Sequence, residues 1–565
     1  MNMPIHHRSI SNHSMLNEST LNGPIAVIGA GTMGIGIAQV AAQAGHTVLL
    51  FDVNSEAAQR ALNTLHTRLH QRVKAGKADA SKTQELLQRI TLVDSLHSLV
   101  SSALVIEAII EKLAAKQDLF RQLETLCSAQ TLFASNTSSL SITAIASVLE
   151  APQRMAGLHF FNPAPLMKLV EIVQGLETSP QTMATLKRLV IGWQKQPVIC
   201  RSTPGFIVNR IARPFYAEAL RALEEQIASP ATLDAVMKDS GGFAMGPLQL
   251  TDLIGHDVNY AVTESLFDAF YGDTRFQPSL RQKELVEANH LGRKSGRGFY
   301  VYAGKDYADK TQQQFIPTIT EIITETSPTA LIPSEQIKII GNWSALPHFT
   351  TLLQQHGLLH PNKIAAEKSE NIQLPSPVLQ IDDVIFMLAT GKTSSQLTDE
   401  IGMPVVQFDL SANHQTAPIM TISAACQNTQ QQTAKVINFL YALGKQVILL
   451  PDYPALLTMR TVAMLCNEAL DALNKGIANA EDIDLAMCYG VNYPIGPLTW
   501  GNQLGWQQIL STLENLQHFY GEPRYRPSPL LRQLAAGYVS LPHISPQHPS
   551  STQQHEHQFK KKNHA

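Results

Sequence analysis

The sequence predicts an α/β domain with a mostly parallel sheet, a mainly helical domain after it, and a shortened second copy of both. Two observations support this prediction. Apolar strand-like segments alternate with helical stretches from residue 25 onward and give way to long helical patterns after Thr203. Residues 204–255 also align without a gap on residues 454–505. The second copy can therefore be compared with the first, position by position.

The first domain begins with a strand, a glycine turn, a helix and a second strand. IAVIGAG opens at Ile25, MGIGIAQVAAQA carries small and apolar residues at helical spacing, and HTVLLFD is extended after Gly45. Polar helical stretches separate further apolar segments, which lie at 103–108, 131–134, 155–160 and 167–173. Because strands that alternate with helices form parallel sheets covered on both faces, we expect a doubly wound sheet here.

These patterns divide the chain into segments with different expected structures. We expect disordered tails at 1–22 and 541–565, an α/β domain at 23–202, a helical domain at 203–302, a polar linker at 303–333, a reduced α/β domain at 334–451 and a second helical domain at 452–540. The first helix of the first helical domain is expected over FIVNRIARPFYAEALRALEEQ, which begins at Phe206.

The register between the two copies adds 250 to each residue number. Shared positions are mostly apolar, small or turn-forming, so the common requirement is a fold; the polar identities are Arg210, Glu218 and Asp234, matched by Arg460, Glu468 and Asp484. Three polar residues of the first copy are lost in the second: His159 aligns with Asp409, Glu171 with Thr421 and Asn209 with Met459. We expect the second copy to be catalytically silent and to pack within the chain as a built-in partner.

Composition excludes several classes of protein. A hydrophobic fraction of 44% with 16% charged residues is ordinary for a globular enzyme, and a net charge of -3 gives no reason to expect a nucleic-acid or membrane partner. The five cysteines show no C-x-x-C spacing, so neither a disulfide framework nor a metal site is expected. Without an apolar run of about 18 residues or a signal peptide, a cytoplasmic location is expected.

A glycine loop follows the first strand. Gly29, Gly31 and Gly34 form G-A-G-T-M-G at the start of a helix, where glycines allow a tight turn, backbone contact with a pyrophosphate and close packing of helix on strand. Asp52 ends the second strand, where a carboxylate binds an adenosine ribose and repels a 2'-phosphate. The sequence therefore predicts a Rossmann-like site for NAD, against the alternative of a glycine turn that binds nothing.

The reduced domain is expected to lack this site. Aligning Ile337–Gly341 with Ile25–Gly29 places Trp343 at the position of Gly31 and Leu346 at that of Gly34, and an indole there would block a pyrophosphate.

A histidine and a glutamate lie on two successive strand-like segments. His159 ends MAGLHF and Glu171 lies in KLVEIV, so a hairpin that folds back about position 165 would make them cross-strand neighbours. A carboxylate on one imidazole nitrogen raises the basicity of the ring and leaves the other nitrogen to accept a proton. A lone histidine is often only structural, but a carboxylate within an apolar strand needs a partner.

Two further polar residues have two interpretations each. Ser138 follows the strand TLFA, where it can contact a substrate or cap the helix in SITAIASVL. Asn209 lies one turn into the first helix of the helical domain, where its amide can donate to a substrate oxygen or make a buried bond between helices.

The motifs SNTSSLSIT, GLHFFNPAPLMKLVEIV, TPGFIVNRI, MGPLQLTDLIG and GRKSGRGFYVY resemble the 3-hydroxyacyl-CoA dehydrogenase family, in order, from Ile25 to Tyr302. The resemblance implies a Rossmann-like domain followed by the all-α C-terminal domain of that family, here with a reduced second copy. It implies NAD-dependent oxidation of a (3S)-3-hydroxyacyl-CoA with His159 as base and Glu171 as its orienting partner. It also implies that Ser138 and Asn209 hold substrate oxygens, and that Glu111, Lys116 and Asn162 border the cofactor and substrate.

Substrate and partners are less closely defined. The resemblance to two-copy bacterial members implies 3-hydroxyadipyl-CoA of phenylacetate catabolism as the substrate; the alternative is 3-hydroxybutyryl-CoA of fatty acid or butanoate metabolism. A different class, a non-enzymatic NAD-binding protein on the same fold, is the second alternative. A distal carboxylate would need a basic partner, for which Arg201, Arg210, Arg213 and Lys168 are candidates. Arg60, Arg68, Arg72 and Lys74 could bind the CoA phosphates or line a solvated helix face, and a homo-oligomer is possible.

Overall fold

The computed structural model describes residues 21–302, 322–323, 337–359 and 377–541. The chain divides into two compact units, residues 1–206 and residues 207–565. The predicted tails lie almost wholly outside the described residues, as does most of the predicted linker. Within that linker, Ile322–Ile323 forms an edge strand, β9, which pairs antiparallel with a strand of the second unit.

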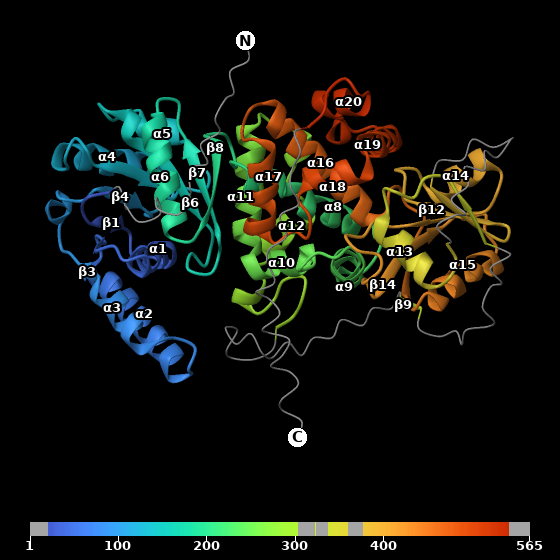
Figure 1. Cartoon of the computed structure of the whole chain (residues 1–565), viewed down its shortest axis with the longest axis horizontal. Helices are drawn as coiled ribbons and strands as arrows, with labels where there is room; N and C mark the ends of the chain where they lie inside the picture. Colours follow the sequence, from blue (N-terminus) through green and yellow to red (C-terminus); the bar gives the residue numbers. More distant parts are fainter. Residues whose placement is uncertain (1–20, 303–321, 324–336, 360–376, 542–565) are drawn as a thin grey trace, which may run out of the picture. The chain divides into compact units, whose positions relative to one another are not determined.

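The first unit is built on an eight-stranded sheet (Figure 1). The strand order is β3-β2-β1-β4-β5-β6-β7-β8, and every neighbouring pair is parallel except β6 and β7. The strands are β1 Ile25–Ile28, β2 Val48–Phe51, β3 Ile90–Leu92, β4 Leu104–Glu107, β5 Leu132–Ser135, β6 Met155–Phe160, β7 Leu169–Gln174 and β8 Gln196–Arg201. The mostly parallel, doubly wound sheet expected from the sequence is confirmed.

Helices cover both faces of this sheet. They are α1 Thr32–Gln43, α2 Ser55–Lys74, α3 Ala80–Gln88, α4 Leu113–Leu126, α5 Ile142–Ala146 and α6 Pro180–Gly192. On one face, Val27 and Ile106 belong to a core shared with α1 and α6. On the other face, Phe133 packs edge-on against Phe120 of α4, with ring centroids 5.8 Å apart. Near-continuous apolar strands are buried on both sides, as a parallel sheet requires.

The second unit begins with the first helical set. It comprises α7 Val208–Ile211, α8 Arg213–Glu224, α9 Pro230–Ala235, a π-helical turn at Val236–Ser240, α10 Pro247–Ile254, α11 His256–Ala269 and α12 Leu280–Glu287. The single first helix expected from the sequence is divided at Ala212, because α8 restarts with Pro214 in its first turn.

A second sheet of the order β10-β11-β12-β13-β14-β15-β9 follows. Its strands are β10 Ile337–Ile340, β11 Val378–Ile381, β12 Val384–Leu388, β13 Val405–Phe408, β14 Ile419–Ala424 and β15 Gln446–Leu450, with helices α13 Pro347–Gln355, α14 Ser394–Ile401 and α15 Gln430–Ala442. The antiparallel pair β13/β14 repeats the register of β6/β7 at +250, since Gln407 is paired with Ser423 as Gly157 is with Val173.

The alignment of β10 with β1 agrees with the sheet order, because β10 lies three strands from β13 in β10-β11-β12-β13 as β1 lies three strands from β6 in β1-β4-β5-β6. In the first sheet β1 lies between two parallel neighbours, whereas β10 lies at the edge and pairs antiparallel with β11. Trp343 is buried and stacks on Phe349, so its indole belongs to a packed core. The segment after β10 therefore carries a buried indole where the first copy has its glycine loop, and the described part of the second sheet has no strands beyond β10 that correspond to β2 and β3.

The second helical set comprises α16 Leu457–Asn474, α17 Ala480–Val491, α18 Pro497–Leu504, α19 Trp506–Tyr520 and α20 Pro529–Ala535. Helices α8 and α16 pack side by side (Figure 1). The arginines and glutamates shared by the two copies pair reciprocally between α7–α8 and α16: Arg210 Nε donates to Glu468 at 2.6 Å, and Arg460 Nε donates to Glu218 at 2.6 Å. All four side chains are buried. The expectation that the second copy packs within the chain as a partner of the first is confirmed.

Candidate active site

The glycine loop has the geometry that a pyrophosphate site needs. Gly29 has φ +99°, and a Cβ there would lie 2.5 Å from the carbonyl oxygen of Ala108. A Cβ at Gly34 would lie 1.7 Å from the carbonyl oxygen of Gly29, so helix α1 approaches the loop as closely as two backbones allow. Gly31 faces open space and is the N-cap of α1 without a side-chain cap. The first N–H groups of this helix therefore remain available to an anion.

Asp52 is held against the same loop. One carboxylate oxygen accepts the N–H of Ala30 at 2.7 Å, and the other accepts the N–H of Asn54 at 2.9 Å. The side chain is half-buried. These bonds fix the carboxylate at the end of β2, where it can accept further hydrogen bonds from ribose hydroxyls.

His159 and Glu171 form the predicted cross-strand pair. The register of β6 and β7 places them directly opposite each other, and His159 Nδ1 lies 2.6 Å from Glu171 Oε2. Glu171 is fully buried and His159 is 6% exposed. Phe161 and Phe206 contact the imidazole, with ring centroids 4.5 and 5.8 Å away. Since the carboxylate engages Nδ1, Nε2 is the nitrogen left for proton transfer.

Glu111 accepts several hydrogen bonds from the loop that carries Ser138. Its carboxylate accepts the hydroxyl of Thr137 at 2.5 Å and the N–H groups of Ser138 and Ser139 at 3.0 and 3.2 Å. Burial raises the pKa of Glu111, but the Thr137 hydroxyl and the Lys116 charge outweigh it and hold the pKa below its usual value. Glu111 is therefore a carboxylate that orders this loop.

Ser138 is not a helix cap. The N-cap of α5 is Ser141, whose hydroxyl oxygen accepts the N–H of Ala144 at 3.2 Å. The capping interpretation of Ser138 is wrong, because α5 begins three residues later than that interpretation requires.

The reasoning from the sequence missed Glu107. It is fully buried at the end of β4 and accepts Lys116 Nζ at 2.5 Å, the Ser135 hydroxyl at 2.6 Å and the Ile109 N–H at 2.7 Å. Lys116 is 1% exposed and also pairs with Glu111 at 3.2 Å. The sequence did indicate a buried, paired carboxylate here, since Glu107 interrupts an apolar strand just as Glu171 does. Lys116 thus lies behind Glu111 instead of at the surface.

The other predicted residues are more exposed. Asn162 is exposed in the loop after β6. Asn209, in the second unit, is half-buried in α7, and its carbonyl oxygen accepts Arg213 Nε at 2.9 Å.

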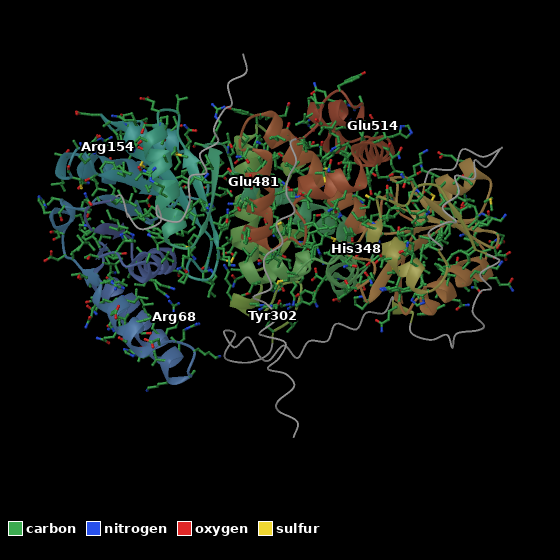
Figure 2. The ribbon with its side chains drawn as sticks, viewed as in Figure 1. Arg68, Arg154, Tyr302, His348, Glu481 and Glu514 are labelled. Carbon is green, nitrogen blue, oxygen red and sulfur yellow. The ribbon has the colours of Figure 1, made fainter. Side chains whose placement is uncertain are left out.

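The basic residues proposed to bind a substrate carboxylate or the CoA phosphates differ in burial and in their partners. Arg210 is excluded as a ligand of a substrate carboxylate because its buried guanidinium is paired with Glu468 and Asp471, each at 2.6 Å. Arg201 and Lys168 are exposed, and Arg213 is buried. Arg68 (Figure 2) lies on α2 and donates to Gln39 Oε1 at 2.7 Å.

The second copy has no comparable group. Asp409, at the position of His159, accepts the N–H groups of Leu410, Thr458 and Met459, each at 2.8 Å. The position of Glu171 is held by Thr421, whose carbonyl oxygen accepts the N–H of Asp409 at 2.9 Å, so its neighbour across the sheet is not a histidine. The position that carries a base in the first copy is thus a structural anchor in the second.

Within the described ranges, no group of three or more His, Cys, Asp or Glu side chains could hold a metal ion. The five cysteines, all in described parts of the chain, are free thiols. No helix among the described residues has both the length and the apolar character needed to span a bilayer.

Family models match most of the chain. The 3-hydroxyacyl-CoA dehydrogenase NAD binding domain matches residues 24–203, and the C-terminal domain of the same family matches residues 205–302 and again 457–538. The chain belongs to the 3-hydroxyacyl-CoA dehydrogenase family. The reduced Rossmann-fold domain of 3-hydroxybutyryl-CoA dehydrogenase matches residues 386–454. The chain is therefore an oxidoreductase that uses NAD to oxidise 3-hydroxyacyl-CoA, and the non-enzymatic alternative is not supported.

Individual relatives agree with this assignment. A 3-hydroxyadipyl-CoA dehydrogenase of Escherichia coli is 48% identical over 93% of this chain and 100% of its own length. A probable 3-hydroxybutyryl-CoA dehydrogenase of Bacillus subtilis is 42% identical over 51% of this chain and 98% of its own. A crystal structure described as 3-hydroxybutyryl-CoA dehydrogenase from Escherichia coli covers 92% of this chain and 100% of its own, with 48% identity and a TM-score of 0.77. The names of the two-copy relatives thus differ in the acyl group.

Proposed function

We propose that this enzyme oxidises (3S)-3-hydroxyadipyl-CoA to 3-oxoadipyl-CoA with NAD. The observation that carries the proposal is the 48% identity to a relative that is named for 3-hydroxyadipyl-CoA and is matched over its whole length. The relative named for 3-hydroxyadipyl-CoA matches 93% of the chain, including both copies, whereas the Bacillus subtilis relative named for 3-hydroxybutyryl-CoA matches 51%.

His159 acts as the general base in this proposal. Its Nε2 takes the proton from the C3 hydroxyl, while Glu171 holds Nδ1 at 2.6 Å and stabilises the imidazolium that forms. Burial of Glu171 strengthens this support, because a carboxylate in a low-dielectric surrounding interacts strongly with an adjacent positive charge. The Phe161 and Phe206 rings fix the plane of the imidazole.

Gly29, Gly31, Gly34 and Asp52 would hold NAD through its pyrophosphate and ribose. Bound NAD supplies the hydride acceptor for C3. The hydroxyl of Ser138 and the amide of Asn209 would hold substrate oxygens. Glu111 orders the loop of Ser138, Lys116 positions Glu111 from beneath, and Asn162 would border the cofactor.

A second candidate substrate is 3-hydroxybutyryl-CoA, which the description of the Escherichia coli crystal structure favours. The two substrates differ in the distal carboxylate, so a direct comparison separates them. We expect kcat/KM of the full-length protein to be at least about 10-fold higher for 3-hydroxyadipyl-CoA than for 3-hydroxybutyryl-CoA, a difference of about 1.4 kcal/mol. An equal or reversed preference would overturn the assignment of the acyl group and leave the reaction class intact.

A further inference from the structure

Four arginines line a pocket of about 300 Å³ in the second unit. Three of them have carboxylate partners. Arg221 pairs with Glu225 and Glu522. Arg275 pairs with Asp273 and Glu468, and Arg524 lies within 4.0 Å of Glu218 and Glu522. Arg213 has no such ion pair within the described parts of the chain. A buried arginine is rarely left without a counter-charge, because desolvation of a lone charge is costly.

The contacts of Arg213 are all neutral. Nε donates to the carbonyl oxygen of Asn209 at 2.9 Å, one terminal nitrogen donates to the Thr263 hydroxyl at 3.2 Å, and the guanidinium lies over the Tyr216 ring, 4.8 Å from its centroid. The residue is 5% exposed, and burial lowers its pKa from the usual value. A guanidinium carries five N–H donors, so these acceptors satisfy only part of it.

Two phenols add further donors to this cluster. Tyr216 lines the same pocket, and the ring of Tyr493 packs on that of Phe215, two residues from Arg213, with centroids 5.5 Å apart. The Tyr493 hydroxyl is buried and has no hydrogen-bond partner within the described residues. The cluster therefore offers a positive charge and hydroxyl donors without an anion to accept from them.

The second copy shows that this cluster is not required by the fold. Arg213 aligns with Ala463 and Tyr216 with Cys466, whereas Arg210 and Glu218, which hold the two copies together, are retained as Arg460 and Glu468. The loss of Arg213 accompanies the losses of His159, Glu171 and Asn209. This pattern marks Arg213 as a functional residue.

We propose that Arg213, with the hydroxyls of Tyr216 and Tyr493, binds the distal carboxylate of a dicarboxylic 3-hydroxyacyl-CoA. The inference rests on the proposed function and adds the residues that select the substrate. Asn209 and Arg213 are one helical turn apart, about 6 Å along the axis, and Ala212 between them keeps helical dihedrals. A chain whose C3 oxygen lies at the Asn209 amide can thus present its far end to the guanidinium. Because Tyr493 comes from the second copy, that copy contributes to substrate recognition.

The test is a ratio of specificities. We would measure kcat/KM for 3-hydroxyadipyl-CoA and for 3-hydroxyhexanoyl-CoA, which has the same chain length without the carboxylate, in the full-length wild type and in Arg213→Met, Arg213→Lys and Tyr493→Phe. We expect the ratio to fall about 100-fold in Arg213→Met, less in Arg213→Lys, and about 3- to 10-fold in Tyr493→Phe. Arg201→Met and Lys168→Met, which remove the exposed candidate charges, should keep the wild-type ratio.

The outcomes separate the two proposals. A wild type that shows no preference for 3-hydroxyadipyl-CoA overturns the proposed substrate whatever the variants do. A wild type that prefers it, with the preference unchanged in Arg213→Met or lost in Arg201→Met or Lys168→Met, overturns the assignment of Arg213 and leaves the substrate standing. Tyr493→Phe removes a single hydroxyl and provides an independent result if Arg213→Met does not fold.

Discussion

The reciprocal ion pairs Arg210–Glu468, between α7 and α16, and Arg460–Glu218, between α16 and α8, are not equivalent, and two matched substitutions should reveal the difference. Glu468 has a second acid beside it: Asp471 accepts Arg210 at 2.6 Å and lies 3.3 Å from Arg275. The residue of the first copy that aligns with Asp471 is Arg221, so Glu218 has no such neighbour. Without Glu218, the nearest recorded acid to Arg460 is the partly exposed Glu225, at 3.8 Å.

The expected magnitudes follow from these contacts. Glu218→Gln leaves the fully buried Arg460 with phenol partners and should cost about 3–5 kcal/mol, the usual penalty for removing one partner of a buried pair. Glu468→Gln keeps Asp471 opposite Arg210 and should cost about 1–2 kcal/mol. At about 2 °C per kcal/mol for a domain of this size, the unfolding midpoint should fall by roughly 6–10 °C and 2–4 °C respectively.

Thermal unfolding of the purified full-length variants at one pH and one salt concentration measures both shifts. Glu514→Gln is a matched control, because Glu514 (Figure 2) forms an exposed pair with Arg532 at 2.5 Å that should contribute at most about 1 kcal/mol. A midpoint for Glu468→Gln as low as that for Glu218→Gln would refute the compensating role of Asp471.

Three other results are expected. His159→Gln should lower kcat about 100-fold or more while the Kd of NADH, from fluorescence titration, stays within a few-fold; equal turnover would remove His159 from the mechanism. Lys195 Nζ donates to backbone carbonyls of the loop between the strands of His159 and Glu171, so Lys195→Met should lower kcat/KM. The aligned residue Lys445 makes the same kind of contact in the second copy, and Lys445→Met should leave kcat/KM unchanged. Equal losses of kcat/KM in the two variants would indicate a general effect on folding. Burial lowers the pKa of His414 to about 4. The free energy of unfolding should therefore be at its full value above pH 6.5 and should decrease by roughly 3 kcal/mol as the pH falls toward 4, because only the unfolded chain binds the proton in that range. Urea midpoints at pH 7 and pH 4.5 should show this decrease in the wild type and a smaller one in His414→Phe.

The sequence could predict the His159–Glu171 pair because hairpin pairing has a period of two. Once two strands fold back about position 165, residues equidistant from the bend must face each other, and a shift by one residue would turn the glutamate to the other face of the sheet. The glycine loop was predictable for a similar reason, since each glycine answers a local backbone requirement.

The position of a strand within a sheet is not a local property. IKIIG takes the place of β1, but β10 lies at an edge because the described part of the second sheet has no counterparts of β2 and β3, and its one neighbour, β11, runs in the opposite direction. The buried ion pair between Glu107 and Lys116 could be predicted only in part from the sequence. Glu107 carried the same signal as Glu171, yet its partner Lys116 lies on a helix, and which residues of a helix reach a buried acid depends on how that helix is docked.

The carboxylate of Asp409 makes the loss of the second catalytic centre hard to reverse. It receives two N–H groups from the first turn of α16, a helix whose own N-cap residue provides no side-chain cap. Restoring histidine at this position would withdraw an anion from the electropositive end of that helix and place there a ring that gains positive charge during turnover. A substitution of Asp409 by histidine would lower the stability of the fold before any catalytic activity returned, so selection for stability opposes a second catalytic centre in the same chain.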